Sequence, residues 1–190
     1  MTYNQNFGNI AEDLVDISSY DNLLFDIKYA TKTNFTGSKI YEKPITILHK
    51  DAAIKLQYAI TCAMENGYKL KIFDSFRPYE SQQKLWNFMP NPDYVSNPET
   101  GPSTHCRGIA LDLTLVDVTN KELDMGTEFD EFSSKSHHNS NEITQQQRGN
   151  RITLAGIMSI SGFQSIRTEW WHYQLPNINQ YPKYKLGAIC

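Results

Sequence analysis

Residues 108–116, GIALDLTLV, constrain the fold of this chain more than any other segment. Strict alternation is typical of a strand, and it places two sets of side chains on opposite faces: Ile109, Leu111, Leu113 and Leu115 on one, and Ala110, Asp112, Thr114 and Val116 on the other. Asp112 interrupts an otherwise apolar pattern that indicates burial. A lone buried carboxylate costs several kcal/mol unless it is paired or bound to a metal. The sequence therefore predicts a buried strand whose one carboxylate requires a partner.

The rest of the chain alternates between strand-like and helix-like segments. Strands are predicted over residues 23–29, 45–48, 69–75 and 168–175, and helices over residues 52–66, from Pro78 to Phe88, and over 144–161. Asp51 is a suitable N-cap for the first helix and Gly67 a suitable residue just after its end. Residues 89–104 contain four prolines and predict an irregular loop. Interspersed elements with short connections favour antiparallel pairing, so we predict the α+β class.

Length, charge and hydropathy exclude several classes of protein. The 190 residues suit a single domain, residues 1–190, because domains mostly contain about 100–200 residues. With 18 basic and 21 acidic residues the net charge is −3, so we expect no nucleic-acid partner. The apolar runs are far shorter than the ~18 residues that span a bilayer, so we expect no membrane span. Nothing in the sequence specifies an oligomeric state.

Cysteine usage and the N-terminal sequence predict the compartment. Cys62, Cys106 and Cys190 are odd in number and form no CxxC pair, which argues against a disulfide framework. The stretch MTYNQNFGNIAEDLVDI lacks the basic and apolar regions of a signal peptide. We therefore expect a cytoplasmic protein. A periplasmic or exported protein, whose leader is absent from this sequence, is the alternative.

Two of the five histidines lie close to other metal-ligand residue types. His105 precedes Asp112 by seven residues, and His172 lies near the end of the chain. Imidazole and carboxylate form a zinc-type ligand set, and three protein ligands leave a fourth position for water, as in catalytic zinc sites. In a regular strand residues 105 and 112 point to opposite faces, so both reach one ion only if residues 106–108 interrupt the pleat. Gly108 permits such an irregularity.

Glu169 precedes His172 by three residues. Zinc lowers the pKa of a bound water from 15.7 toward ~7, and a nearby carboxylate that does not bind the metal can accept the proton. Residues three apart point to opposite faces of a strand, so we predict an irregular or turned backbone within residues 168–172. Taken singly, each residue has a structural alternative: a histidine at a strand edge, an ion-paired aspartate, or core tryptophans at Trp170 and Trp171.

Together these motifs resemble a known family. The pattern Ser-x-His-x-Arg-Gly-x-Ala-x-Asp, residues 103–112, followed by Glu-x-x-His, residues 169–172, is similar to that of the zinc D-alanyl-D-alanine dipeptidases (VanX-type), within the wider group of zinc D-Ala-D-Ala peptidases. Further matching stretches extend the resemblance over residues 23–175: Asp26–Thr31, Asn34–Gly37, Phe76–Pro78, Met125–Gly126, Phe129–Asp130, Ser136–His138 and Glu169–Tyr173.

The resemblance implies a zinc peptidase that hydrolyses the dipeptide D-Ala-D-Ala to two D-alanines. It implies one zinc ion per chain and a small mixed, mainly antiparallel sheet flanked by helices, as in the hedgehog/D-Ala-D-Ala-peptidase fold. The ligands that it implies are His105, Asp112 and His172, with Glu169 as the general base for the attacking water.

Four further roles follow from the same resemblance. Arg77 would stabilise the developing oxyanion, a role that suits a guanidinium because it cannot be deprotonated. Asp130 would bind the substrate ammonium, with Tyr29 nearby, and Ser103 would help to hold the polar ends of the substrate.

Several positions depart from the family pattern or fall outside it. Cys106 stands where relatives often have serine or another polar residue, and we expect a neutral thiol rather than a fourth ligand. His137 and His138 are expected in a loop or beside the site rather than as ligands. The loop before Ser103 is shorter than in some members.

Two other functions compete with the dipeptidase. A D,D-carboxypeptidase or peptidoglycan endopeptidase of the same group would keep the zinc and the base but needs an open groove, and Asp130 and the absent leader argue against it. A non-catalytic zinc-binding domain would have lost Glu169 or Arg77, and both are present.

Overall fold

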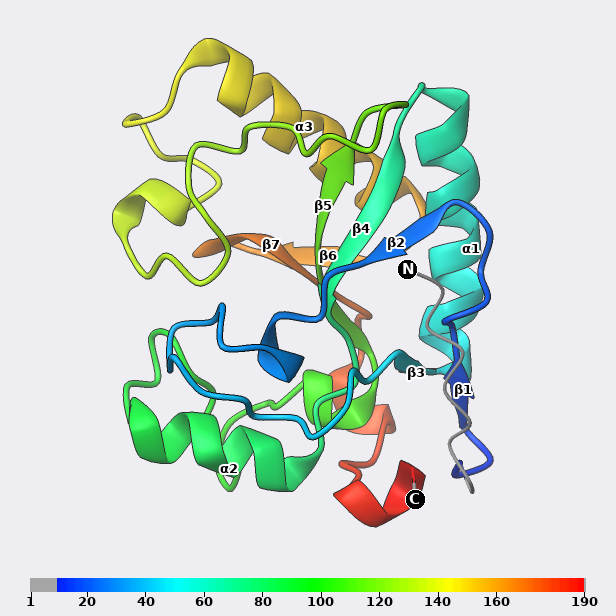
Figure 1. Cartoon of the computed structure of the whole chain (residues 1–190), viewed down its shortest axis with the longest axis vertical. Helices are drawn as coiled ribbons and strands as arrows, with labels where there is room; N and C mark the ends of the chain where they lie inside the picture. The colour runs from blue at the N-terminus through cyan, green and yellow to red at the C-terminus, as the bar shows by residue number, and fades with distance from the viewer. Residues whose placement is uncertain (1–9, 190) are drawn as a thin grey trace.

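The computed structural model describes residues 10–189 and is built around a five-stranded sheet (Figure 1). Its strands lie in the order β2 (Leu23–Phe25), β4 (Lys69–Asp74), β5 (Ala110–Val116), β7 (Glu169–Gln174) and β6 (Gln164–Ile166). β2 pairs with β4 in parallel, and all other neighbours in this sheet are antiparallel. The predicted α+β class with a mixed, mainly antiparallel sheet is therefore confirmed.

Two long helices cover one face of this sheet. α1 (Lys50–Glu65) and α3 (Gln145–Ile160) contact each other, and they pack against β4 and against β5 and β7, respectively. Their buried apolar side chains form one core cluster with Leu111, Leu113 and Leu115 of β5. The face of β5 that the alternation predicted to be apolar is thus fully buried under the helices.

A second, two-stranded sheet adjoins the start of α1. It pairs β1 (Leu14–Asp16) with β3 (Ile47–His49) in antiparallel register, and β3 runs directly into α1. α2 (Tyr79–Phe88) follows β4 after a short connection.

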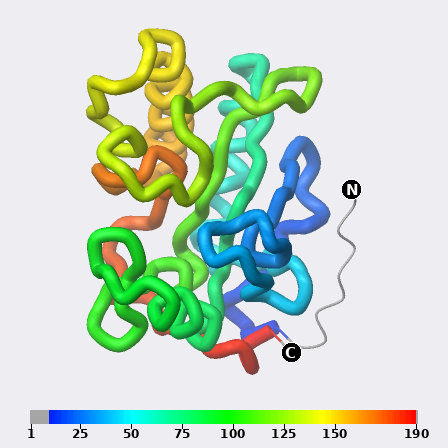
Figure 2. The backbone as a smooth tube through the Cα atoms, turned by 60° about the vertical axis from the view of Figure 1, so that its left-hand side comes forward, coloured from blue at the N-terminus to red at the C-terminus, as the bar shows by residue number. Residues whose placement is uncertain are grey.

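The other face of the five-stranded sheet carries Asp112 and is covered mainly by connecting segments. Figure 2 shows residues 26–46 and 89–109 in the lower half of the view, away from α3, whereas residues 117–143 pass beside α3 and hydrogen-bond to its Arg148 and Arg151. These segments contain short 3₁₀ helices, Lys28–Ala30, His105–Arg107 and Ser134–Ser136, and two more lie in the tail, Ile178–Gln180 and Leu186–Ile189. Side chains from irregular backbone therefore cover the face of β5 that carries Asp112.

The predicted caps of the helices have mixed outcomes. Asp51 as the N-cap of the first helix is wrong, because α1 begins at Lys50 and the cap is His49, whose Nδ1 accepts from the Asp51 backbone N–H at 3.2 Å. The end at Gly67 is confirmed by its φ of +79°. α3 begins after Thr144, whose side chain forms a capping box, and agrees with the predicted span 144–161.

The predicted strand over 23–29 is too long. Only Leu23–Phe25 pairs with β4, and the chain then turns into the 3₁₀ helix Lys28–Ala30, which buries Tyr29. β1 and β6 contain three residues each, too few for a periodic pattern to be recognised.

Some sequence-based expectations lie outside the described residues. These are the expectations for Cys190 and for the first nine residues. Those nine residues make up about half of the stretch MTYNQNFGNIAEDLVDI, on which the signal-peptide argument rests. Within residues 10–189, none of the helices combines the length and apolar character that a membrane crossing requires.

Candidate metal centre and active site

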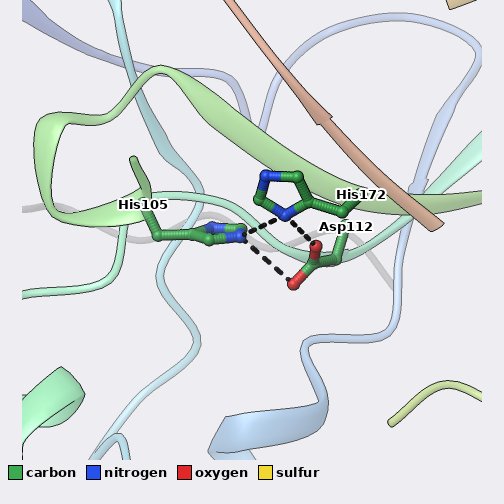
Figure 3. Close-up of side chains that lie close together, drawn as sticks. All are labelled: His105, Asp112 and His172. Atoms are coloured by element: carbon green, nitrogen blue, oxygen red, sulfur yellow. Dashed lines mark hydrogen bonds and ion pairs between the residues drawn. The ribbon is translucent and has the colours of Figure 1, made fainter. Parts of the chain in front are cut away.

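His105, Asp112 and His172 converge on one point in the interior (Figure 3). Asp112 lies in the middle of β5, and His172 of β7 is its register partner in the antiparallel pair. His172 Nδ1 lies 3.1 Å from Asp112 Oδ1, His105 Nε2 lies 3.3 Å from Asp112 Oδ2, and these two nitrogens are 3.2 Å apart. Among residues 10–189, only this group combines three His, Cys, Asp or Glu side chains in metal-binding proximity.

His105 reaches this point because the backbone before β5 leaves the pleat. Residues His105–Arg107 form a 3₁₀ helix, and Gly108 follows with a φ of +66°. A Cβ atom at Gly108 would lie 2.8 Å from the backbone nitrogen of His49, so both the left-handed conformation and the close approach require glycine. The predicted interruption of the pleat at residues 106–108 is confirmed.

Both imidazoles are oriented by partners on their outer sides. His105 Nδ1 lies 2.7 Å from the carbonyl oxygen of Ser75, and His172 Nε2 lies 2.9 Å from Gln174 Oε1. Carbonyl and amide oxygens accept hydrogen bonds, so each outer nitrogen carries a proton. In the neutral ring that metal binding requires, the inner nitrogens then present lone pairs to each other and to Asp112.

Three lone-pair-bearing atoms this close together repel one another unless a cation lies between them. Ligand atoms about 2.0–2.1 Å from a tetrahedral zinc ion lie roughly 3.3 Å apart, which matches the observed spacing. Burial alone would raise the pKa of Asp112, yet positive charge on the His105 and His172 rings lowers that pKa well below its usual range, so a cation at this point favours the ionised carboxylate. The side chains present therefore fit one zinc ion and leave one position for water.

Glu169 lies at the start of β7 on the same side as His172. Its Oε2 is 3.9 Å from His172 Nδ1, although residues three apart point to opposite faces in a regular strand. The pairing of β7 with β6 shows that β7 is irregular here. Ser165 pairs with Tyr173, but the next residue, Ile166, pairs with Glu169, so the register shifts between them. The irregularity predicted within 168–172 is confirmed. Burial raises the pKa of Glu169 to about 7.

Arg77 follows β4 and is held by two polar side chains. Its Nε and Nη2 donate to Asp74 Oδ2 at 2.9 and 2.8 Å, and its Nη1 donates to Gln82 Oε1 at 2.9 Å. Nη2 also lies 3.5 Å from Asp112 Oδ2, and the guanidinium carbon lies 4.8 Å from the ring centroid of Tyr29. A guanidinium fixed beside the ligand set can stabilise negative charge that develops on a substrate oxygen.

Asp130 faces the same cavity from the segment between β5 and α3. The Tyr29 hydroxyl lies 3.2 and 3.0 Å from its two carboxylate oxygens. Burial raises the pKa of Asp130 well above its ordinary value, and the negative charge of Asp112 adds to the shift. A cation placed against this carboxylate would favour its ionised form, so the position suits an ammonium group.

Ser103 ends the proline-rich loop in a left-handed conformation, with a φ of +45°. Its hydroxyl lies 3.5 Å from Ser96 Oγ and donates to the Asn97 carbonyl at 3.4 Å. All eight residues that the sequence singled out line one cavity of about 340 Å³: Tyr29, Arg77, Ser103, His105, Asp112, Asp130, Glu169 and His172.

Three side chains of the site were missed by the sequence analysis. Asp74 could have been found, because it is an acidic residue in a predicted strand and lies three residues before Arg77. Gln82 of α2 and Gln174 of β7 carry no comparable pattern. Their roles depend on where α2 and β7 pack.

Cys106, His137 and His138 stay outside the ligand set. Cys106 is fully buried, and burial raises the pKa of its thiol to about 11, so it is a neutral thiol near neutral pH. The His137 carbonyl accepts from Arg151, and the His138 backbone N–H donates to the Arg167 carbonyl.

A site of two imidazoles and one carboxylate, with a second carboxylate and a guanidinium beside it, defines a zinc-dependent hydrolase of the peptidase class. The family model described as D-Ala-D-Ala dipeptidase matches residues 12–186, and the chain belongs to this peptidase family.

Curated relatives have the same description. The chain is 40% identical to the D-alanyl-D-alanine dipeptidase of Escherichia coli, over 90% of this chain and 88% of the relative. It is 36% identical to the D-alanyl-D-alanine dipeptidase of Enterococcus faecalis, over 80% of this chain and 85% of the relative. A solved vancomycin-resistance D,D-pentapeptidase, VanY, in complex with Zn(II), matches with a TM-score of 0.44 and 16% identity, over 70% of this chain and 75% of that chain.

Proposed function

We propose that this protein hydrolyses the dipeptide D-Ala-D-Ala to two D-alanine molecules, with one zinc ion held by His105, Asp112 and His172. The observation that carries the proposal is the single cavity in which this ligand set, Glu169 and the half-buried Asp130 face one another. A volume of about 340 Å³ suits a small substrate. The names of the curated relatives support the same substrate.

The residues beside the metal divide the chemistry between them. Zinc, when bound, supplies a Lewis acid and lowers the pKa of the attacking water. Glu169 accepts the proton of that water and delivers it to the leaving amine, and its pKa of about 7 suits both transfers near neutral pH. Arg77, held by Asp74 and Gln82, donates to the oxygen on which negative charge develops.

Asp130 and Ser103 account for the ends of the substrate. The Asp130 carboxylate, with the Tyr29 hydroxyl against it, binds the free ammonium by a charge-assisted hydrogen bond. Ser103 holds a polar end of the substrate from the loop wall of the cavity. A D,D-carboxypeptidase or endopeptidase acts on a longer peptide whose corresponding nitrogen is an uncharged amide. Such a substrate would leave the half-buried Asp130 carboxylate without a cation, which favours the dipeptidase.

The test compares D-alanine release by zinc-loaded protein from D-Ala-D-Ala and from N-acetyl-D-Ala-D-Ala. We expect rapid release from the free dipeptide alone. Comparable release from both substrates would assign the protein to the carboxypeptidases. No release from either, with zinc bound, would leave the non-catalytic zinc-binding domain. Asp130→Asn should raise KM for the free dipeptide.

We infer that residues 1–190 act as one domain and that the protein is cytoplasmic. One continuous apolar core supports the first inference. The second is supported by the free thiols of Cys62 and Cys106, which suit a reducing compartment. Cell fractionation followed by immunoblotting tests the location, and recovery in the periplasmic or secreted fraction would contradict it.

A further inference from the structure

Asp130 has a backbone conformation that its surroundings must maintain. Its φ is +62°, in the left-handed region that residues with a Cβ seldom adopt. Such conformations persist only where neighbouring contacts determine them, and they concentrate at functional sites. Among residues 10–189, the hydrogen bonds of the Tyr29 hydroxyl go to the Asp130 carboxylate and not to its backbone. The contacts that hold residues 127–136 therefore decide where this carboxylate lies.

A chain of side-chain hydrogen bonds ties this segment to β7. Trp170 Nε1 donates to Thr127 Oγ1 at 2.7 Å, Thr127 Oγ1 lies 3.1 Å from Ser136 Oγ, and Ser136 Oγ donates to the Glu131 carbonyl. An indole N–H can only donate and a carbonyl can only accept, so the Thr127 hydroxyl must donate to Ser136. Each hydroxyl then accepts one bond and donates one, an arrangement in which the bonds strengthen one another.

The two ends of this chain lie next to the two functional parts of the cavity. Trp170 directly follows Glu169, and Glu131 directly follows Asp130. Trp170 is 2% exposed and Ser136 is 1% exposed, so water competes little for their bonds. The hydrogen bonds therefore hold the amine-binding segment at a set position relative to the strand that carries Glu169.

We propose that Thr127 is a positioning residue for recognition of the substrate amine, because its hydroxyl joins the Asp130 segment to β7. This inference rests on the proposed dipeptidase function. Thr127 lines a neighbouring cavity rather than the one that contains the ligand set, so it acts through Asp130 and not by touching substrate.

The kinetic consequence of losing this bond is specific. The substrate ammonium is charged in both the ground state and the transition state, so Asp130 contributes equally to both. Displacing Asp130 therefore raises KM and leaves kcat almost unchanged, in contrast to the loss of a group that acts only in the transition state.

Thr127→Val tests the role, because it replaces the hydroxyl by a methyl group of similar size. We expect KM for D-Ala-D-Ala to rise about tenfold, the effect of one hydrogen bond, with kcat changed less than about twofold. Zinc content should stay the same, and the preference for the free over the N-acetylated dipeptide should fall. Thr127→Ser should restore KM. Thr153→Val, at a half-buried position on α3 where the hydroxyl donates to the Gly149 carbonyl of the same helix, is the matched control.

Ser136→Ala interrupts the same chain of hydrogen bonds one step further along and should raise KM in the same way. It serves as the test if Thr127→Val folds poorly. An unchanged KM and preference in either folded variant would overturn the role of Thr127. A loss of zinc and kcat that Thr127→Ser does not restore would also overturn it, since that is a general structural effect. Absence of release by the unchanged protein would overturn the proposed function together with this role.

Discussion

His172 of β7 lies opposite Asp112 of β5, and its Nδ1 can face the Asp112 carboxylate at 3.1 Å because its other ring nitrogen is held by Gln174 at 2.9 Å. Gln174 is two residues further along the same strand, so both side chains point to the same face. One strand thus supplies a proposed metal ligand together with the group that sets its tautomer. Asp112 is fixed in the neighbouring strand, so the pairing of β5 with β7 sets the spacing of two ligands.

Removing the partner of His172 should weaken metal binding. Gln174→Ala leaves the His172 ring free to rotate and to change tautomer, so we expect zinc affinity to fall about 10–100-fold. Titration against a chelator of known zinc affinity measures the change. His172→Ala, which removes the ligand itself, is the reference for complete loss of zinc and activity. An unchanged affinity in Gln174→Ala would show that the amide does not orient the ring.

Glu169→Gln should separate proton transfer from metal binding. The amide keeps the size of the side chain but cannot accept the proton of the attacking water, so we expect kcat to fall by about 10²–10⁴-fold. Zinc content should remain at one ion per chain, because Glu169 is outside the ligand set. Metal analysis and D-alanine release on the same sample test both points. A variant that retains turnover would exclude Glu169 as the base.

Arg77→Lys keeps the positive charge and changes its geometry. A lysine ammonium cannot preserve the contacts with Asp74 and Gln82 while also donating to the substrate oxygen. We expect kcat to fall by about 10²–10³-fold with little change in KM. Arg148→Lys, in α3 and outside the cavity, is the matched control. A raised KM with normal kcat would instead make Arg77 a ground-state binding residue.

His138 should make stability depend on pH in the weakly acidic range. Burial lowers the pKa of His138 below its ordinary value of 6.5, and the Arg151 charge adds to the shift. Its Nε2 is buried and has no hydrogen-bond partner within residues 10–189. The unfolded chain therefore binds the proton more readily than the folded one. The contribution of this residue is fully present above pH ~6.5 and is lost as the pH falls toward the lower folded-state pKa.

Replacing His138 tests this dependence directly. We expect His138→Gln to flatten the decline of the denaturation midpoint between about pH 7 and pH 5 relative to the unchanged protein. Urea unfolding at several pH values measures the midpoints. Curves that decline in parallel for both proteins would remove His138 as a source of acid sensitivity.

Local sequence was sufficient for the elements whose pattern repeats over several turns or residues. The alternation in 108–116 predicts β5, and the helix predicted over 144–161 agrees with α3 to within one residue at each end. Three-residue strands such as Gln164–Ile166 do not repeat a pattern often enough to be recognised. The cap of α1 was mispredicted because β3 continues into the helix, so that His49 occupies the position expected of Asp51.

The residues that we propose as metal ligands and catalytic groups came from their motifs, and one of those motifs required a broken pleat before Gly108. Such inferences need only local rules: the two-residue period of a strand and the conformational freedom of glycine. The contact between Asp112 and His172, 60 residues apart, and that between Tyr29 and Asp130, 101 apart, depend instead on strand order and loop packing. So do the partners that set each histidine's tautomer and the hydrogen bonds that hold Asp130. Strand order and packing arise from burial summed over many distant residues, and no short stretch of chain encodes that sum.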